Sequence, residues 1–258
     1  MKRALIAMVL LGLCACGPKM DDLETGETGK VTAVSDGDTL TLDSGLKVQL
    51  TGIIAPQRGF GERPGEPKAN EARQTLEKLA LNRPARLGYG GAKRFKETTA
   101  LAQLFVRTEG GRWIWVQDAM VREGMARVRT WPDNHARFKT LYADEARARA
   151  EKKGIWSDRA FAVRGADKIK ADEKGFQIVE GAVKSIGVTE KKTYLNFGDD
   201  YRVDFTVAIN AADLKNWTKA DAPLDSLKDH RIRVRGFVYD AGGPIIYVDH
   251  PQAIEMLK

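Results

Sequence analysis

The sequence predicts a mainly β protein with helices, an α+β fold in which a small β-barrel with helices is followed by a second small β-barrel. Three observations lead to this prediction. Apolar and polar residues alternate with strand periodicity in residues 31–50, helical periodicity appears within residues 70–153, and strand alternation returns in residues 176–258. Strands that come first and helices that pack later are typical of a barrel with helices on one side.

The first half of the chain contains most of the expected helices. Strands are expected at residues 31–34, 39–42 and 46–50, joined by turns at Asp36-Gly37 and Asp43-Ser44-Gly45. A helix is expected over residues 70–81, where Asn82-Arg83-Pro84 ends it. Two further strands at 85–89 and 101–106, a strand face carrying Trp113 and Trp115, and helices at 116–125 and 136–153 complete this half.

The second half has shorter elements. Strands are expected at residues 178–183, 194–197, 204–209 and 232–237, with a short helix over 211–217. Five or so short strands and one helix in about eighty residues favour a partly open Greek-key barrel. The predicted organisation is a signal peptide at 1–15, a tether at 16–28, a first domain at 29–160, a charged linker at 161–175 and a second domain at 176–258.

The N-terminus predicts export. Lys2 and Arg3 precede an apolar stretch from Ala4 to Leu13, and small residues then precede Cys16. This arrangement resembles the bacterial lipobox, which implies cleavage before Cys16 and lipidation of that cysteine. A plain signal peptide with incidental cysteines is the alternative. Because Gly17 replaces the acidic residue that commonly retains lipoproteins in an inner membrane, anchoring to the periplasmic face of an outer membrane is favoured.

The cysteine count and the charge distribution limit the classes of function. Cys14 and Cys16 are the chain's two cysteines, so the processed protein would have no thiol for a disulfide or for Cys-ligated zinc. The whole chain has a formal net charge of +7. Lys and Arg exceed Asp and Glu in residues 16–160 and equal them in residues 161–258. A basic first domain favours a polyanionic partner such as nucleic acid or lipid headgroups.

One motif carries the most functional information. Asp36-Gly37-Asp38-Thr39 is followed by the segment from Gln49 to Gln57, which ends in Ile53-Ile54-Ala55-Pro56-Gln57. This pair of segments resembles the thermonuclease (staphylococcal-nuclease-like) family, and residues 101–106, 120–128 and 146–156 match later signatures of that family in order. The resemblance implies a five-stranded OB-type barrel with helices. Residues 176–258 resemble the OB-fold-like domain found behind some secreted nuclease-like domains.

The same resemblance implies a calcium-dependent nuclease, but this chain departs from the family's active-site pattern. The family uses two aspartates near one calcium ion, a glutamate as general base and two arginines. Only Asp38, a calcium ligand, is retained, whereas Ile54 replaces the second aspartate and Gln57 the glutamate. Gln49 and Thr99 stand where the arginines belong. An amide cannot act as a general base, and general-base catalysis contributes about 10²–10⁴ in rate. We therefore expect no catalytic residues and no cofactor. Ca²⁺ would be required only if some activity survives.

Other cations could contact phosphates. Arg94, with Lys93 and Lys96, and Arg58 lie near the lost positions, although solvated loop charges are the alternative. Arg231, Arg233 and Arg235 alternate with apolar residues, so a strand would present all three on one face. Nearby aromatic residues could stack on bases of a single strand or could simply fill the core, namely Tyr194, Phe197, Tyr201 and Tyr239.

These observations predict an envelope lipoprotein with a catalytically degenerate nuclease-like domain. Its predicted role is to bind nucleic acid, another polyanion or an envelope protein without catalysis. The first alternative is a calcium-dependent phosphodiester endonuclease that acts on DNA or RNA with substitute residues. The second is a structural envelope scaffold, which would bind a protein partner in a salt-insensitive way and have no affinity for nucleic acid.

Overall fold

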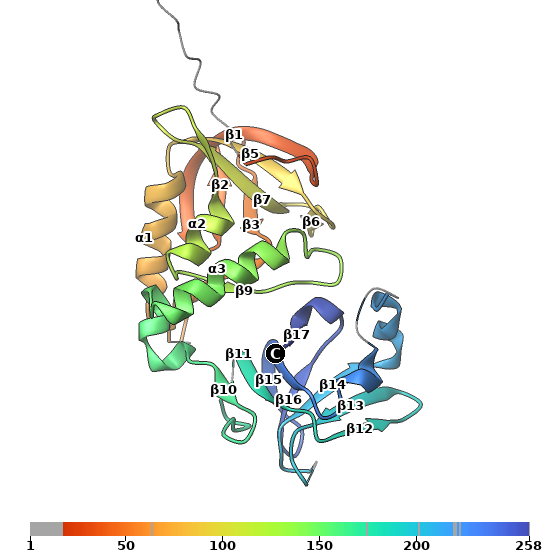
Figure 1. Cartoon of the computed structure of the whole chain (residues 1–258). Helices are drawn as coiled ribbons and strands as arrows, with labels where there is room; N and C mark the ends of the chain where they lie inside the picture. The colour runs from red at the N-terminus through yellow and green to blue at the C-terminus, as the bar shows by residue number, and fades with distance from the viewer. Residues whose placement is uncertain are drawn as a thin grey trace, which may run out of the picture.

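Figure 1 shows two β-barrels, one beneath the other, in a computed structural model that describes residues 18–62, 64–173, 175–200, 202–218, 221 and 223–257. The predicted signal peptide and Cys16 lie outside these residues. Within the described residues, no helix combines the length and apolar character needed to cross a membrane.

The first barrel is a closed ring of five strands. They are β1 (Glu24–Asp36), β2 (Thr39–Leu42), β3 (Lys47–Leu50), β5 (Pro84–Tyr89) and β7 (Thr99–Arg107). β1 is long enough to pair with both β2 and β5, β2 pairs with β3, β3 runs parallel to β7, and β7 pairs with β5. Alternate side chains such as Leu40, Leu50 and Leu104 fill the interior. The α+β prediction is confirmed for this domain.

Short strands and three helices surround this ring. The strands are β4 (Ile53–Ile54), β6 (Arg94–Phe95), β8 (Trp113–Trp115) and β9 (Arg127–Val128), and the helices are α1 (Ala69–Ala80), α2 (Val116–Arg122) and α3 (Phe138–Ala150). α1 buries Ala72, Leu76 and Ala80, which recur every four residues and form one face of the helix. A Cβ at Gly37 would lie 2.6 Å from the Cβ of Ala55, so the Asp-Gly turn needs glycine to pack beneath α1.

The second barrel repeats the strand order of the first. Its elements are β10 (Arg164–Gly165), β11 (Gly175–Ala182), β12 (Ser185–Val188), β13 (Lys192–Asn196), β14 (Thr206–Asn210), β15 (Arg231–Asp240), β16 (Pro244–Tyr247) and β17 (Ile254–Met256). β11 pairs with β15 and β12 with β13, while β14 runs parallel to β16. β11 and β12 together take the place of the long β1, since β11 pairs with β15 on one side and β12 pairs with β13 on the other, although the sequence shows no repeat. The expected helix at 211–217 is a 3-10 helix, η3 (Ala211–Asn216), and another, η4 (Leu224–Leu227), lies before β15.

Two predicted boundaries are wrong. The tether was expected to reach residue 28, but β1 begins at Glu24 and Leu23 is buried in the first core. The linker at 161–175 is also structured, because β10 pairs in parallel with β11 and Ile169 belongs to the second core. Two 3-10 helices, η1 (Gly154–Ser157) and η2 (Arg159–Phe161), lead into it, and a third, η5 (Pro251–Ala253), precedes β17. Buried apolar residues, Leu23 and Ile169, hold the two segments in place. The spacing of apolar residues in these segments is too irregular to predict a helix or a strand.

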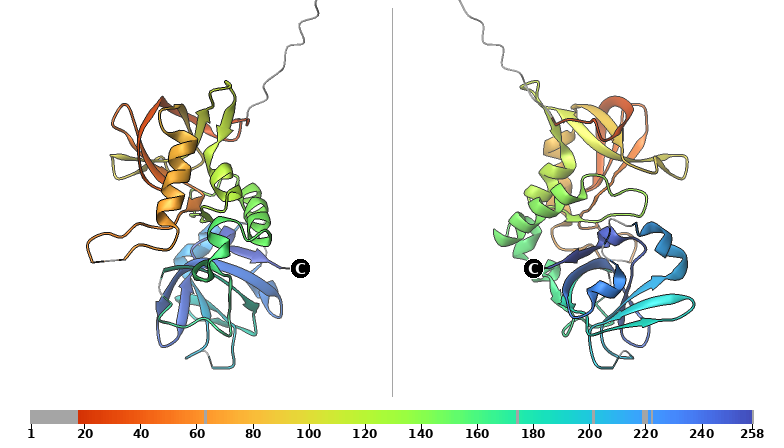
Figure 2. Two further views of the ribbon diagram at one scale, coloured as in Figure 1. Left: turned by 90° about the vertical axis from the view of Figure 1, so that its left-hand side faces the viewer. Right: turned by 45° about the vertical axis from the view of Figure 1, so that its right-hand side comes forward.

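The two barrels are packed against each other, and Figure 2 shows this contact from two further sides. Ile54 of β4 forms an apolar cluster with Phe176 and Ile178 of β11. Arg235 of β15 is 4% exposed and makes a two-pronged ion pair with Glu145 of α3, with N–O distances of 2.9 and 2.6 Å. Apolar packing and a buried charge pair therefore hold the second barrel against the β4, β9 and α3 side of the first.

Candidate functional site

A cavity of about 720 Å³ lies where the two barrels meet. The first barrel contributes residues of β3, β4, β6, β7 and β9, and the second contributes Phe176 and Phe237 of β11 and β15. The five positions identified in the sequence line this cleft together: Asp38, Gln49, Ile54, Gln57 and Thr99. Residues distant in the sequence thus meet in one site, and the second barrel covers part of it.

Asp38 is held by hydrogen bonds at the base of the cleft. Its side chain is buried, and its Oδ2 atom accepts the backbone N–H of Ala55 at 3.0 Å and the amide of Gln57 at 3.4 Å. The Thr39 hydroxyl lies 3.2 Å from Oδ1. Burial raises the pKa of the Asp38 carboxyl, although these hydrogen bonds oppose the shift. The carboxyl group therefore joins the Asp-Gly turn to the loop after β4.

The two glutamines stabilise the same loops. The Gln49 amide nitrogen donates to the Asp38 carbonyl at 3.3 Å, and its oxygen accepts the Thr39 hydroxyl at 3.0 Å. The Gln57 amide donates to the Ala55 carbonyl at 2.9 Å. Neither amide can take up a proton near neutral pH. A second carboxylate near Gln57, besides Asp38, is Glu66, which accepts the backbone N–H of Gln57 at 2.7 Å.

The cleft side chains do not fit the calcium ion that the resemblance implies. Calcium binds about six to eight oxygen ligands, usually with several carboxylates. The Oδ2 atom of Asp38 already accepts the Ala55 N–H and the Gln57 amide, and Ile54 supplies only carbon atoms. Across the part of the chain that the structure describes, no three His, Cys, Asp or Glu side chains are grouped to hold a metal. We therefore derive no chemical step through calcium.

Comparison with known proteins agrees with the fold and the motif. Residues 47–158 match the family model described as staphylococcal nuclease homologue. The chain contains a thermonuclease-like domain. It is 26% identical over 135 residues to the thermonuclease of Staphylococcus hyicus, covering 51% of this chain and 77% of that protein. It is also similar to probable endonucleases LCL3, with 26% identity over 174 residues in Scheffersomyces stipitis (54% and 70% covered) and 30% over 154 residues in Phaeosphaeria nodorum (56% and 50% covered).

The thermonuclease-like domain brings two arginines to the cleft that the sequence analysis missed. Arg127 is buried, donates to the Phe176 carbonyl at 2.5 Å and lies 3.4 Å from the Glu66 carboxylate. Its guanidinium also lies 4.9 Å from the centroid of the Phe161 ring. These contacts hold Arg127 in the interface between the barrels, so its role is structural.

Arg129 has different surroundings. Its guanidinium carbon lies 4.5 Å from the centroid of the Trp131 ring and 4.9 Å from that of Phe237. Burial lowers the pKa of Arg129, and the negative charges of Asp38 and Asp249 oppose the shift, yet a guanidinium stays charged in proteins. Among the described residues, no side chain forms an ion pair with it. Two aromatic rings thus fix a charged group whose N–H donors remain available. Its alternation with buried Val128 is the sequence signal that could have revealed it.

Arg94 does not lie in the cleft, contrary to the hypothesis that it supplies a substitute cation. It forms an ion pair with Glu27, and it donates to the Tyr89 hydroxyl at 2.6 Å. Arg58 pairs with Asp36 at 3.1 Å. Both arginines are therefore engaged by acidic residues of β1, namely Glu27 within the strand and Asp36 at its end. These partners lie on β1 because the strand extends beyond its predicted bounds.

The arginine stripe of β15 also needs correction. Arg233 pairs with Glu180 and Glu255 and is largely buried, and Arg235 is the interface residue that binds Glu145. Only Arg231 has an exposed side chain. The three arginines do share one face of β15. Carboxylates of the first barrel and of the neighbouring strands β11 and β17 engage Arg233 and Arg235 on that face, so the stripe is not a nucleic-acid surface. Of the predicted stacking residues, Phe197 lies in the second core, Tyr239 is exposed, and Tyr201 is outside the described residues.

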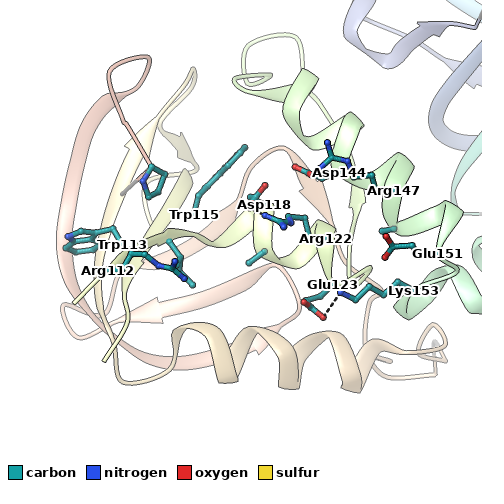
Figure 3. Close-up of a pocket in the computed structure, with 14 residues that line it drawn as sticks. Arg112, Trp113, Trp115, Asp118, Arg122, Glu123, Asp144, Arg147, Glu151 and Lys153 are labelled. Carbon is teal, nitrogen blue, oxygen red and sulfur yellow. Dashed lines mark hydrogen bonds and ion pairs between the residues drawn. The ribbon is translucent and has the colours of Figure 1, made fainter. Parts of the chain in front are cut away.

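A second cavity, of about 660 Å³, lies away from the cleft between β8, α2 and α3 (Figure 3). Asp118 of α2 and Asp144 of α3 share a hydrogen bond there. Burial, the hydrogen bond to Asp144 and the Asp144 charge raise the pKa of Asp118 to about 6. Two carboxyl groups that interact directly cannot both be ionised without a cost in free energy.

We expect Asp118→Asn to stabilise the folded protein near neutral pH. Because the pKa of Asp118 is higher in the folded protein than in the unfolded chain, the contribution of this group to stability is fully present below pH 3.8. That contribution is lost as the pH rises from 3.8 through about 6. Asparagine carries no charge, so it removes this loss. Because the site is partly open to solvent, we expect a gain of about 1 kcal/mol at about pH 7.5 and little change at about pH 3.5. Urea unfolding at both pH values measures it, with exposed Glu109→Gln as the control, and equal effects at both pH values would contradict it.

Proposed function

We propose that the cleft binds the phosphate backbone of nucleic acid without cutting it. The observation that carries this proposal is Arg129, a charged group fixed between Trp131 and Phe237 and lacking a carboxylate partner among the described side chains. A planar guanidinium matches the geometry of phosphate oxygens and can donate two hydrogen bonds at once. Lys47 also lines the cleft and adds positive charge at its edge.

The same residues argue against efficient hydrolysis. Phosphodiester cleavage needs a group that activates water and positive charge on the developing oxyanion. Gln57 cannot accept the proton, and Thr99 carries no charge to stabilise the oxyanion. Glu66 is a carboxylate close to Gln57, but it already accepts hydrogen bonds from the Gln57 backbone and from Arg127. The side chains that line the cleft therefore favour binding of a phosphodiester over its hydrolysis.

Binding is tested with fluorescently labelled single-stranded DNA and RNA and the purified protein. We expect affinity that falls steeply as salt rises, because bound phosphates release counterions. Arg129→Ala should weaken binding by about 10-fold to 100-fold, the value of hydrogen bonds to a charged group. Arg122→Ala, an exposed arginine of the second cavity, is the control and should change little. If nothing binds at low salt, the proposal fails and the scaffold hypothesis remains.

A cleavage assay on the same strands tests the enzymatic alternative. It compares added calcium with a chelator for the natural protein and for the variants Gln57→Glu, Asp38→Ala and Glu66→Gln. We expect no cutting by any of them. Calcium-dependent cutting that disappears in Asp38→Ala or Glu66→Gln would overturn the proposal and identify a phosphodiesterase with a substitute base.

We further propose that the protein is exported and anchored through Cys16 to the periplasmic face of a bacterial membrane, where an envelope protein could be a second partner. The basic and apolar N-terminus with its lipobox-like cysteine supports this proposal. Labelling cells with a radioactive fatty acid should mark the natural protein and not Cys16→Ser. Equal labelling of both, or recovery of both from the soluble fraction, would contradict the anchor.

A further inference from the structure

We infer that the ligand of the cleft is a single strand, which continues from Arg129 across an aromatic surface of the second barrel. This inference rests on the proposed function and deepens it by naming the class of nucleic acid. The surface consists of Tyr239 on β15, Tyr247 on β16 and Tyr194 on β13, and we call it the tyrosine face.

Two further cavities connect the cleft to the tyrosine face. The cleft shares Arg129, Trp131 and Phe237 with an adjoining cavity of about 260 Å³ between the barrels. That cavity shares Tyr247 with a third, of about 750 Å³, on the outside of the second barrel. Because each cavity shares lining residues with the next, a chain-like ligand can pass along them from one barrel to the other.

Strand register places the three tyrosines on one side of the sheet. Tyr194 and Tyr247 both pair with Ala208 of β14, one from each side. Tyr239 pairs with Ile245, two residues before Tyr247, so it projects from the same face. The rings of Tyr239 and Tyr247 lie 5.8 Å apart in an edge-to-face arrangement, and the two residues are 53% and 41% exposed. Adjacent exposed rings offer stacking surfaces to successive bases.

Positive charges accompany these rings. Lys192 lies 4.9 Å from the centroid of the Tyr247 ring, and Arg129 lies over Phe237 at the other end of the path. Two carboxylates along the path are engaged: Asp249 contacts His250 at 2.6 Å, and Asp204 accepts the backbone N–H of Asp200 at 2.8 Å. Cations therefore alternate with aromatic rings along the path.

This alternation suits a single strand rather than a duplex. In a duplex the faces of the bases are covered by their stacked neighbours, so aromatic side chains cannot stack on them, whereas an unpaired strand can place base faces on aromatic rings and phosphates on cations. Every base has a stacking face, so this surface would accept many sequences. The same chemistry fits DNA and RNA.

The inference is tested by anisotropy with labelled DNA and RNA strands of about 4 and about 15 nucleotides, which span the site sizes of OB barrels. We expect the long strand to bind the natural protein at least ten-fold more tightly than a duplex of equal length. The double variant Tyr239→Ala/Tyr247→Ala should lose about ten-fold or more for the long strand and little for the short one. Tyr239→Phe/Tyr247→Phe, which keeps the rings, should bind like the natural protein, as should Phe60→Ala, an exposed aromatic elsewhere.

The outcomes separate this inference from the function on which it rests. Strand binding that depends on Arg129 but is unchanged in the double tyrosine variant would overturn the inference and leave phosphate binding intact. Equal affinity for duplex and single strand would also overturn it. Absence of any binding at low salt would overturn both. A preference for the RNA or the DNA strand at equal length would identify the source of the ligand.

Discussion

Replacing Glu145 by Gln lowers the free energy of unfolding by about 3 kcal/mol, because it removes the fully buried one of the two carboxylates that pair with the buried guanidinium of Arg235 and leaves Glu255 as its only charged partner among the described residues. Burial alone would lower the pKa of Arg235, but the carboxylates of Glu145 and Glu255 raise it, so the charge persists in the interface. Glutamine keeps the shape of the side chain and can still accept the Val128 N–H. Urea unfolding, followed by circular dichroism, measures the change.

Two controls distinguish the buried charge from general effects on α3. Arg147→Ala removes an exposed partner of Asp144 on the same helix, and we expect a change within about 1 kcal/mol. Replacing Arg235 as well, as Glu145→Gln with Arg235→Met, should recover much of the loss because the buried guanidinium is removed while the Val128 N–H keeps its acceptor. If Glu145→Gln is no more harmful than Arg147→Ala, the ion pair does not hold the barrels together.

The sequence predicted the fold well where periodicity was continuous. Residues 39–42 alternate strictly and became β2, and apolar residues spaced along 70–81 became α1. Short elements were missed for physical reasons. β16 (Pro244–Tyr247) begins with proline and carries three apolar residues in succession, so it shows no alternation, and β4 has only two residues. Such strands depend on tertiary pairing rather than on a local pattern.

The candidate site was predicted in part. Local motifs identified Asp38, Gln49 and Gln57, because a turn and a following strand keep them close in space whatever surrounds them. The second barrel's contribution could not be predicted, since Phe237 reaches Arg129 only when two separate domains pack together. The ion pairs of the arginines could not be predicted from the sequence either. The alternation of Arg233 and Arg235 with apolar residues indicates a nucleic-acid surface, because their carboxylate partners lie on other elements of the fold.

Ile54 connects the altered nuclease motif to the packing of the second barrel. It stands where the family has a metal-binding aspartate, and here it is 7% exposed against Phe176 and Ile178. The position at which the resemblance implies a calcium ligand is therefore the position that makes an apolar contact between the barrels. A carboxylate at this position would lie against the apolar cluster, which disfavours a metal site in the covered cleft.

We therefore expect Ile54→Asp to destabilise the protein by about 3–5 kcal/mol without producing calcium-dependent cleavage. The substitution removes buried apolar atoms and places a carboxylate in an apolar contact. Ile54→Val, which removes one methylene group, should cost only about 0.5–1.5 kcal/mol. Urea unfolding with and without calcium measures both variants. Calcium would restore the stability of Ile54→Asp only if Asp38 and the new carboxylate could bind the ion together, and that result, or the appearance of cleavage, would show that the second barrel leaves room for a working metal site.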